Sequence, residues 1–189
     1  MKRLSNLMLM AGFISTVFYS ASFPYIYAET VKVVPTFYIS LEQILYCLGT
    51  VIFCKLWNQY SDRLFKHYRL FLWLEIVADL YLFGDVLIRR DLSFYFLLNV
   101  IIYSTVTSNL VRGGVKMRAK VNPTEKLRER YDNNNSMICS IATLLGASLA
   151  IFYKAPLGLL FILALIGNII DNFFYLYIYG QLRRMENDK

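Results

Sequence analysis

Acidic side chains lie inside long apolar runs of this sequence. They are Glu42, Glu75, Asp79, Asp85 and Asp171. Placing a carboxylate at the middle of a bilayer costs about 2.5–3.5 kcal/mol, so such groups usually face a cavity or a partner and mark the path of an ion or a substrate. The chemistry that these residues predict is the uptake and release of protons or the binding of a cation.

Depth makes Glu42 and Asp79 the leading candidates. At 1.5 Å per residue, Glu42 lies roughly 12 Å and Asp79 roughly 13 Å from one end of its helix, so both are near the midplane. Glu75 and Asp79 are four residues apart and share a helical face, and two carboxylates in a low dielectric tend to hold a proton between them. The alternative is that each acid is protonated and hydrogen-bonded to a neighbouring helix. Asp85, four residues before Arg89, is expected to form an ion pair near the surface.

A second polar group lies in the last apolar run. Asn168, Asp171 and Asn172 fall on one helical face, where they would either line a cavity or hold helices together. No lysine or arginine lies at mid-depth in any run. A buried cavity would therefore be acidic and would suit a proton, a cation or an amphipathic cationic solute.

The elements that must position these groups are membrane-spanning helices. Hydrophobic residues make up 57% of the chain and charged residues 17%, and the mean hydropathy is +0.45. Soluble domains average roughly 45–50% apolar and about 25% charged residues. The composition therefore disfavours a cytosolic enzyme, a disordered chain and a secreted disulfide scaffold. A span needs about 20 apolar residues. The sequence predicts an all-α transmembrane fold with spans at residues 4–27, 34–57, 70–88, 93–111, 135–153 and 157–180.

The distribution of the basic residues predicts how these spans are oriented in the membrane. With the N-terminus inside, sixteen lysines and arginines fall on the cytoplasmic side and four outside. The positive-inside rule then predicts a multi-pass protein of the cell membrane with both termini cytoplasmic. The net charge of +7 is explained by basic residues near anionic lipid, and no nucleic-acid partner is expected. The alternative for the first span is a signal peptide cleaved after Ala28, which would leave five spans.

The predicted cytoplasmic loops cover residues 58–69 and 112–134. In the longer loop, Asn122 is the expected N-cap of a short interfacial helix that has Pro123 at its first position. This helix would carry Leu127 and Tyr131 toward the bilayer, and the polar run at 132–135 would end it.

Several kinds of chemistry are excluded by counting. The chain has one histidine and three cysteines, and it has neither a GxxxxGK loop nor a GxGxxG turn. A histidine-based triad, a zinc site with several imidazoles and a nucleotide-binding loop are therefore absent. We expect no enzyme activity, no bound metal and no cofactor.

The first predicted loop carries a partial motif. Its order, N-Q-Y-S-D-R-L-F-K-H-Y-R, resembles the G-x-x-x-D-R-x-G-R-R signature of the major facilitator superfamily, at the corresponding place between the second and third spans. Asp62 and Arg63 match the D-R pair, and Lys66 matches the first basic residue. Both family glycines are replaced, and the arginine often found in the family's fourth span is missing.

The resemblance implies a six-helix bundle equal to one half of a facilitator transporter, in a single domain at 1–189. In that family Asp62, Arg63 and Lys66 would form a cytoplasmic gating loop against a second bundle, so a homodimer, a separately encoded second half or a truncated product is expected. The expected function is proton-coupled export of a small solute along a path lined by Glu42, Glu75, Asp79, Asn168, Asp171 and Asn172. The alternative is a non-transporting accessory or immunity protein of the membrane that binds a partner.

Overall fold

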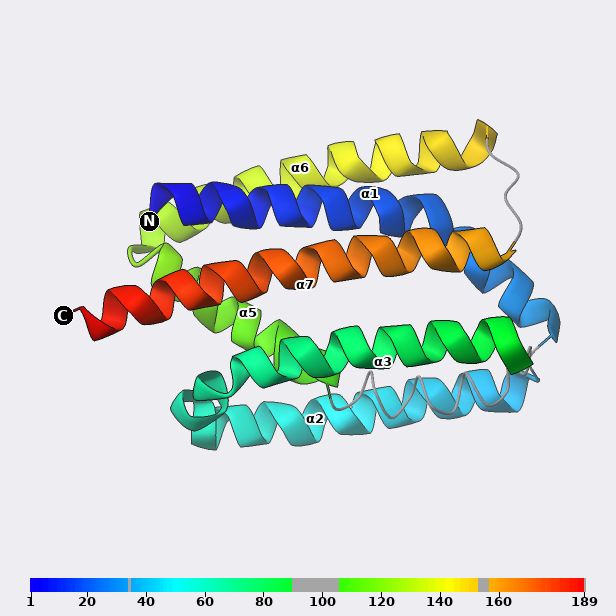
Figure 1. The fold of residues 1–189 in the computed structure, drawn as a ribbon, viewed down its shortest axis with the longest axis horizontal. Coiled ribbons are helices and arrows are strands. Elements are labelled where there is room, and N and C mark those ends of the chain that lie inside the picture. The colour runs from blue at the N-terminus through cyan, green and yellow to red at the C-terminus, as the bar shows by residue number, and fades with distance from the viewer. Residues whose placement is uncertain (34, 90–105, 153–156, 189) are drawn as a thin grey trace. The chain divides into compact units, whose positions relative to one another are not determined.

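The computed structural model describes residues 1–33, 35–89, 106–152 and 157–188, and it places most of them in α-helices (Figure 1). These residues contain no β-strand, which confirms the all-α prediction for the described part of the chain. The predicted span at 93–111 falls mostly outside the described residues. The helices are α1 (Lys2–Val33), α2 (Thr36–Lys66), α3 (Tyr68–Arg89), α5 (Ser108–Val121), α6 (Glu125–Phe152) and α7 (Leu157–Asn187).

Apolar residues occur on all sides of α1, α2 and α7 rather than along one stripe, as is typical of helices that meet lipid or are buried throughout. Among the described residues, three stretches are long and apolar enough to cross a membrane, namely Lys2–Pro24, Thr36–Lys66 and Ile162–Asn187. Helix α3 does not reach this standard because Glu75, Asp79 and Asp85 lie within its 22 residues.

The chain folds as two compact units. Unit 1 consists of Met1–Pro24 and Gly114–Lys189, and unit 2 consists of Tyr25–Gly113. The boundary within α1 falls at Pro24, whose ring removes a backbone donor from the helix and clashes with the preceding turn. One membrane domain of six spans stays a prediction.

In unit 1, helices α1 and α6 run side by side in the same direction (Figure 1). Thr16 Oγ1 lies 3.8 Å from Cys139 Sγ, and Gly12 lies beside Asn135 Oδ1. Both pairs are separated by 123 residues, so from Gly12 to Thr16 the chain advances in the same direction on both helices. The two helices therefore start at the same end of unit 1.

Close helix contact in unit 1 depends on small residues. A Cβ atom at Gly146 would lie 2.5 Å from the carbonyl oxygen of Val17, and one at Gly167 would lie 2.6 Å from Phe18 Cβ. Helices α6 and α7 thus both approach α1 at a glycine, as is common where helices pack inside a membrane. Helix α7 runs opposite to α1, and its last turn lies at the same end of unit 1 as the N-terminus (Figure 1).

In unit 2, the junction between α2 and α3 packs against the first turns of α5. Trp57 Nε1 donates a 2.7 Å hydrogen bond to Asn109 Oδ1, and the Tyr68 hydroxyl donates to the Leu110 carbonyl at 3.1 Å. A Cβ at Gly113 would lie 2.0 Å from the Tyr68 ring. The aromatic side chains therefore fix the start of α5 within unit 2.

The predicted loop at 58–69 is wrong in its secondary structure. Helix α2 continues to Lys66, with one non-helical residue at Tyr60 (φ −126°, ψ 27°), and α3 begins at Tyr68 after the single residue His67. The segment contains no glycine or proline. Charged residues cost a helix little, so their abundance alone does not end it.

In the predicted loop at 112–134, the helix expected after Asn122 is confirmed as the start of α6, whereas the loop that precedes it and the helix end at 132–135 are wrong. Helix α5 extends to Val121, and α6 passes without a break through the polar run at 132–135. The hydroxyl of Thr124, rather than Asn122, caps α6 by accepting a 3.4 Å hydrogen bond from the Leu127 amide. Tyr131 does not face a bilayer, because it is 5% exposed inside unit 1.

Candidate functional site

One polar face of α7 lies inside the candidate span Ile162–Asn187. Asn168, Asp171 and Asn172 occupy it at helical spacings of three and four residues, as the sequence predicts. Asn172 is 3% exposed, and its Nδ2 has no hydrogen-bond partner among the described residues. Asp171 is half-buried, and within the same residues no hydrogen bond or salt bridge reaches its carboxylate. Buried polar groups are nearly always paired, so this face has unused capacity to bind.

The polar face is turned toward α6. The Asp171 carboxyl is close enough to interact electrostatically with the hydroxyls of Tyr131 on α6 and Tyr175 on α7. The guanidinium of Arg118 lies over the Tyr131 ring, with its Cζ 5.6 Å from the ring centroid. Burial raises the pKa of Tyr131 to about 12, an effect that Arg118 opposes and that the carboxylates of Asp132 and Asp171 increase. At neutral pH Tyr131 is therefore a neutral donor.

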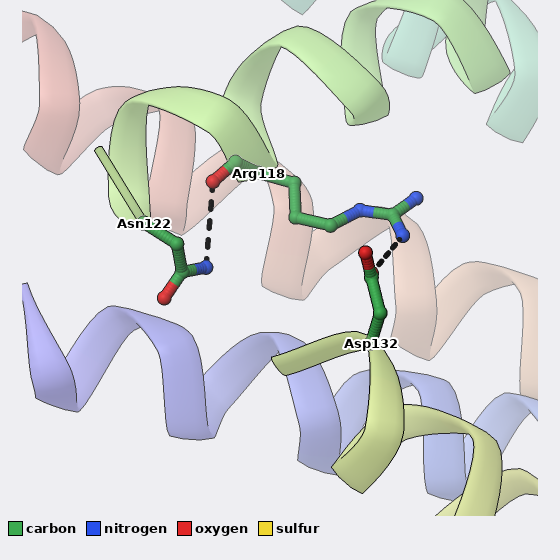
Figure 2. A network of polar contacts seen from close by, with 3 residues as sticks. All are labelled: Arg118, Asn122 and Asp132. Carbon is green, nitrogen blue, oxygen red and sulfur yellow. Dashed lines mark hydrogen bonds and ion pairs between the residues drawn. The ribbon is translucent and has the colours of Figure 1, made fainter. Parts of the chain in front are cut away.

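Polar contacts join α5, α6 and α7 at one end of unit 1. Arg118 Nη1 lies 2.9 Å from Asp132 Oδ1, and Asn122 Nδ2 donates to the Arg118 carbonyl at 3.3 Å (Figure 2). Lys120 Nζ and Glu186 Oε1 form a second ion pair between α5 and α7. Their side chains are a third or more exposed, so each pair contributes at most about 1 kcal/mol. Their effect is to fix the register of the helices that carry the polar face.

The acids of α3 are placed differently. Glu75 and Asp79 lie one turn apart in unit 2, and both are half-buried. Each has an interaction partner in the structure. The side chains of Glu42 on α2 and Asp85 on α3 lie outside the described residues. The structure therefore groups the predicted site residues into one set on α7 and another on α3.

The residues that carry the facilitator-like signature lie at the end of α2. Asp62, Arg63 and Lys66 are exposed, and Asp62 and Lys66 have interaction partners. Between them, Phe65 is buried and its ring stacks on Tyr68, with the ring centroids 5.8 Å apart. The segment is thus a helical turn with an anchored apolar side and a charged outer side.

Sequence reasoning missed three residues of the α7 site. Tyr175 follows Asp171 by four residues and continues the polar face, so helical spacing was a usable signal. Tyr131 and Arg118 come from other helices, and only the packing of α5 and α6 brings them to Asp171. Within the described ranges, no three histidine, cysteine or acidic side chains gather as metal ligands. The site therefore offers carboxyl, amide and phenol groups.

Comparison of the chain with known protein families, with curated protein sequences and with solved structures finds no match.

Proposed function

We propose that this chain is an integral membrane protein that works as a half-size, facilitator-like secondary transporter and exports a small cationic solute in exchange for protons. Its three candidate spans support a membrane location. So do its large exposed apolar side chains, which include Phe37, Val51 and Leu144 at 69%, 68% and 68% exposure. Such surfaces are rare on soluble monomers.

The observation that carries the proposal is the pairing of Asp171 with Asn172. A half-buried carboxyl and a fully buried amide without a partner lie side by side within a candidate span. Acidic groups in such positions are characteristic of proton and ion pathways. An aspartate placed only to hold helices together would instead be expected to have a hydrogen-bond partner.

The exchange follows from the charge of one group. When the Asp171 carboxyl is protonated, the site is neutral and holds a cation weakly. When the proton leaves, the carboxylate attracts a cation, and the Asn172 amide and the Tyr131 hydroxyl can donate hydrogen bonds to the solute or to water. A proton and a cationic solute thus compete for the same carboxylate, which couples their movement in opposite directions.

The same proposal covers the topology and the assembly. The chain would have six spans with both ends in the cytoplasm, and a homodimer or a separately encoded second half would supply the opposite bundle. The exposed Asp62, Arg63 and Lys66 would then contact that bundle and gate the cytoplasmic side. Glu42, Glu75 and Asp79 would line the remainder of the path.

The test is transport by the purified full chain in liposomes with an imposed pH gradient, with the fluorescent cation ethidium as the probe. We expect ethidium to move in the direction opposite to the proton flux in liposomes that contain the wild-type protein, and not to move in empty ones. Asp171→Asn should abolish this movement. Equal ethidium signals from protein-containing and empty liposomes would remove the basis for a cation transporter.

A non-transporting accessory role is the second candidate, and one observation favours it. Glu75, Asp79 and Asn168 all have interaction partners within the protein, as expected of groups that only join helices. In that case the purified chain would be monomeric in detergent and inactive in the ethidium assay, and it would associate with another membrane protein. A stable dimer with ethidium transport would exclude this alternative.

A further inference from the structure

One side of α6 carries a line of small or polar residues at alternating steps of three and four. All of them are exposed, and we call this line the α6 stripe. It consists of Lys126, Glu129, Asn133, Ser136, Ser140, Thr143 and Ala147. Steps of three and four keep successive side chains on one face of a helix. They are also the spacing at which two parallel helices pack along each other.

The α6 stripe faces away from the packed side of its helix. On the packed side, a Cβ at Gly146 would lie 2.5 Å from the Val17 carbonyl oxygen of α1, and Tyr131 and Ala142 are 5% and 0% exposed. Ala142 follows Ser140 of the stripe by two residues, which is about 200° around the helix. The stripe therefore remains exposed after the helices of unit 1 have packed.

The shape of this surface suits a helix better than acyl chains. The Ser140 hydroxyl donates a 2.9 Å hydrogen bond to the Ser136 carbonyl of its own turn, so the middle of the stripe is shallow. Met137 and Leu144, exposed by 58% and 68%, flank it on one side. Small and hydroxyl side chains are enriched where helices pack within a membrane. A shallow line beside large side chains is thus the form that a second helix would fill.

The charges at the start of α6 favour a second copy of the same helix. Within the stripe, Lys126 and Glu129 carry opposite charges. Glu125 lies on one flank of the stripe and Arg130 on the other, and both are exposed. In two parallel helices that meet along such a line, a residue on one flank lies opposite the residue five positions later on the other helix. Glu125 would therefore meet Arg130 of the second copy, and the two-fold symmetry would repeat this ion pair.

The required orientation follows from the membrane. Two copies that obey the positive-inside rule have the same orientation, so their α6 helices run parallel. In a two-fold pair each residue on the axis meets its own counterpart. Asn133 would then meet Asn133 of the second copy, and a single asparagine at such a position is known to fix the register of paired helices.

We propose that the α6 stripe is the interface through which two copies of this chain associate as a parallel pair in the membrane. The inference rests on the membrane location given under the proposed function but not on transport. Lipid would leave the opposite charges of Glu125 and Arg130 without a role, whereas a second copy matches each charge with its opposite.

The first test is self-association of the purified full chain, measured by sedimentation velocity over a range of protein-to-detergent ratios. We expect a reversible dimer. Glu125→Arg and Arg130→Glu should each weaken dimerisation about tenfold, because each reversal affects two symmetric ion pairs. The double variant, which exchanges the two charges, should restore it. Arg184→Glu, at an exposed arginine on α7, is the control and should have no effect.

The second test locates the contact by disulfide cross-linking. The native Cys47, Cys54 and Cys139 are first replaced by alanine, and sedimentation checks that this background still dimerises. Ser140→Cys should then form a covalent dimer on oxidation with copper phenanthroline. Leu145→Cys is the matched control on the same helix, because Leu145 is 46% exposed but lies away from the stripe. It should remain monomeric on a denaturing gel.

Four results would overturn the proposal: a wild-type monomer at every ratio, equal cross-linking through Leu145→Cys, a double charge reversal that fails to restore the dimer, or a different membrane protein bound in place of the second copy. Ethidium transport by a monomer would reject this interface alone. A dimer that forms through the stripe without transporting ethidium would reject only the transport function.

Discussion

Acidic residues lie within apolar runs of both α3 and α7, and their surroundings differ in the structure. On α3, Glu75 and Asp79 are half-buried and each has an interaction partner. On α7, Asp171 is half-buried without a hydrogen bond or salt bridge in the described part of the chain, beside an Asn172 amide that also lacks a partner. Predicted depth favours Asp79, whereas the presence or absence of an interaction partner distinguishes Asp79 from Asp171.

The difference shows which acid is available for chemistry. A carboxyl that is already paired stabilises the helices around it, and its removal costs stability. A carboxyl without a partner contributes little to the fold and is available to a proton or a solute. We therefore consider Asp171 a stronger candidate than Asp79 for binding the proton or the solute, although depth alone favours Asp79.

The largest expected effect is that of Asp171→Asn. The variant should lose proton-driven ethidium transport by about a hundredfold or more, because a positioned proton-transfer group contributes on that scale. Its thermal unfolding in detergent should match that of the wild type, since no hydrogen bond is lost. A variant that transports normally, or one that fails to fold, would break the contrast between α7 and α3.

The second prediction concerns the glycine that precedes the α7 face. Gly167→Ala places a Cβ 2.6 Å from Phe18 Cβ, and overpacking of this kind costs about 1–3 kcal/mol. Gly180→Ala is the matched control on the same helix, because nothing lies within 4 Å of its Cβ position. We expect lower thermal stability and reduced transport for the first variant and wild-type behaviour for the second. Equal behaviour of the pair would mean that contact with α1 does not position the face.

On α3, Asp79→Asn should affect both stability and transport. Loss of its interaction partner should lower the free energy of unfolding by about 1–3 kcal/mol, as measured by chemical denaturation in detergent. Transport per folded molecule should then fall as well, because the residue is proposed to line the path. Unchanged stability would show that the Asp79 carboxyl is as available to a proton or a solute as that of Asp171. The proposed difference between α3 and α7 would then be wrong.

The smallest effect is a pH dependence at Tyr131, next to Asp171. Burial raises the pKa of Tyr131 from 10.0 to about 12, so the unfolded chain loses this proton first as the pH rises. The contribution to stability is complete below pH 10 and is lost toward pH 12, by about 1.4 kcal/mol at pH 11. Thermal unfolding of wild type and Tyr131→Phe between pH 8 and pH 11 should reveal this loss in the wild type only. Parallel curves would place Tyr131 in water rather than beside the α7 face.

Some of this arrangement is predictable from the sequence. The length of the apolar runs predicts long helices, and the spacing of Asn168, Asp171 and Asn172 predicts their common face. Both follow from helix geometry alone. They need no knowledge of how one helix packs on another.

The ends of helices and the contacts between helices are harder to predict from the sequence. Charge and asparagine content indicate loops at 58–69 and 112–134, yet α2, α5 and α6 continue through most of them. Breaks occur at His67 and between Val121 and Glu125, where Pro123 interrupts the chain, and α2 has one non-helical residue at Tyr60. The burial of Tyr131 under Arg118 depends on contacts between α5 and α6, and no local pattern encodes it.

The most direct test of the central claim is to count protons during transport. Liposomes that contain the wild-type chain or Asp171→Asn are loaded with the pH-sensitive dye pyranine, and ethidium is added outside without any imposed gradient. We predict that the lumenal pH changes with ethidium entry in the wild type and stays constant in the variant. An identical pH change in both, or none in the wild type, would contradict a proton-coupling role for Asp171.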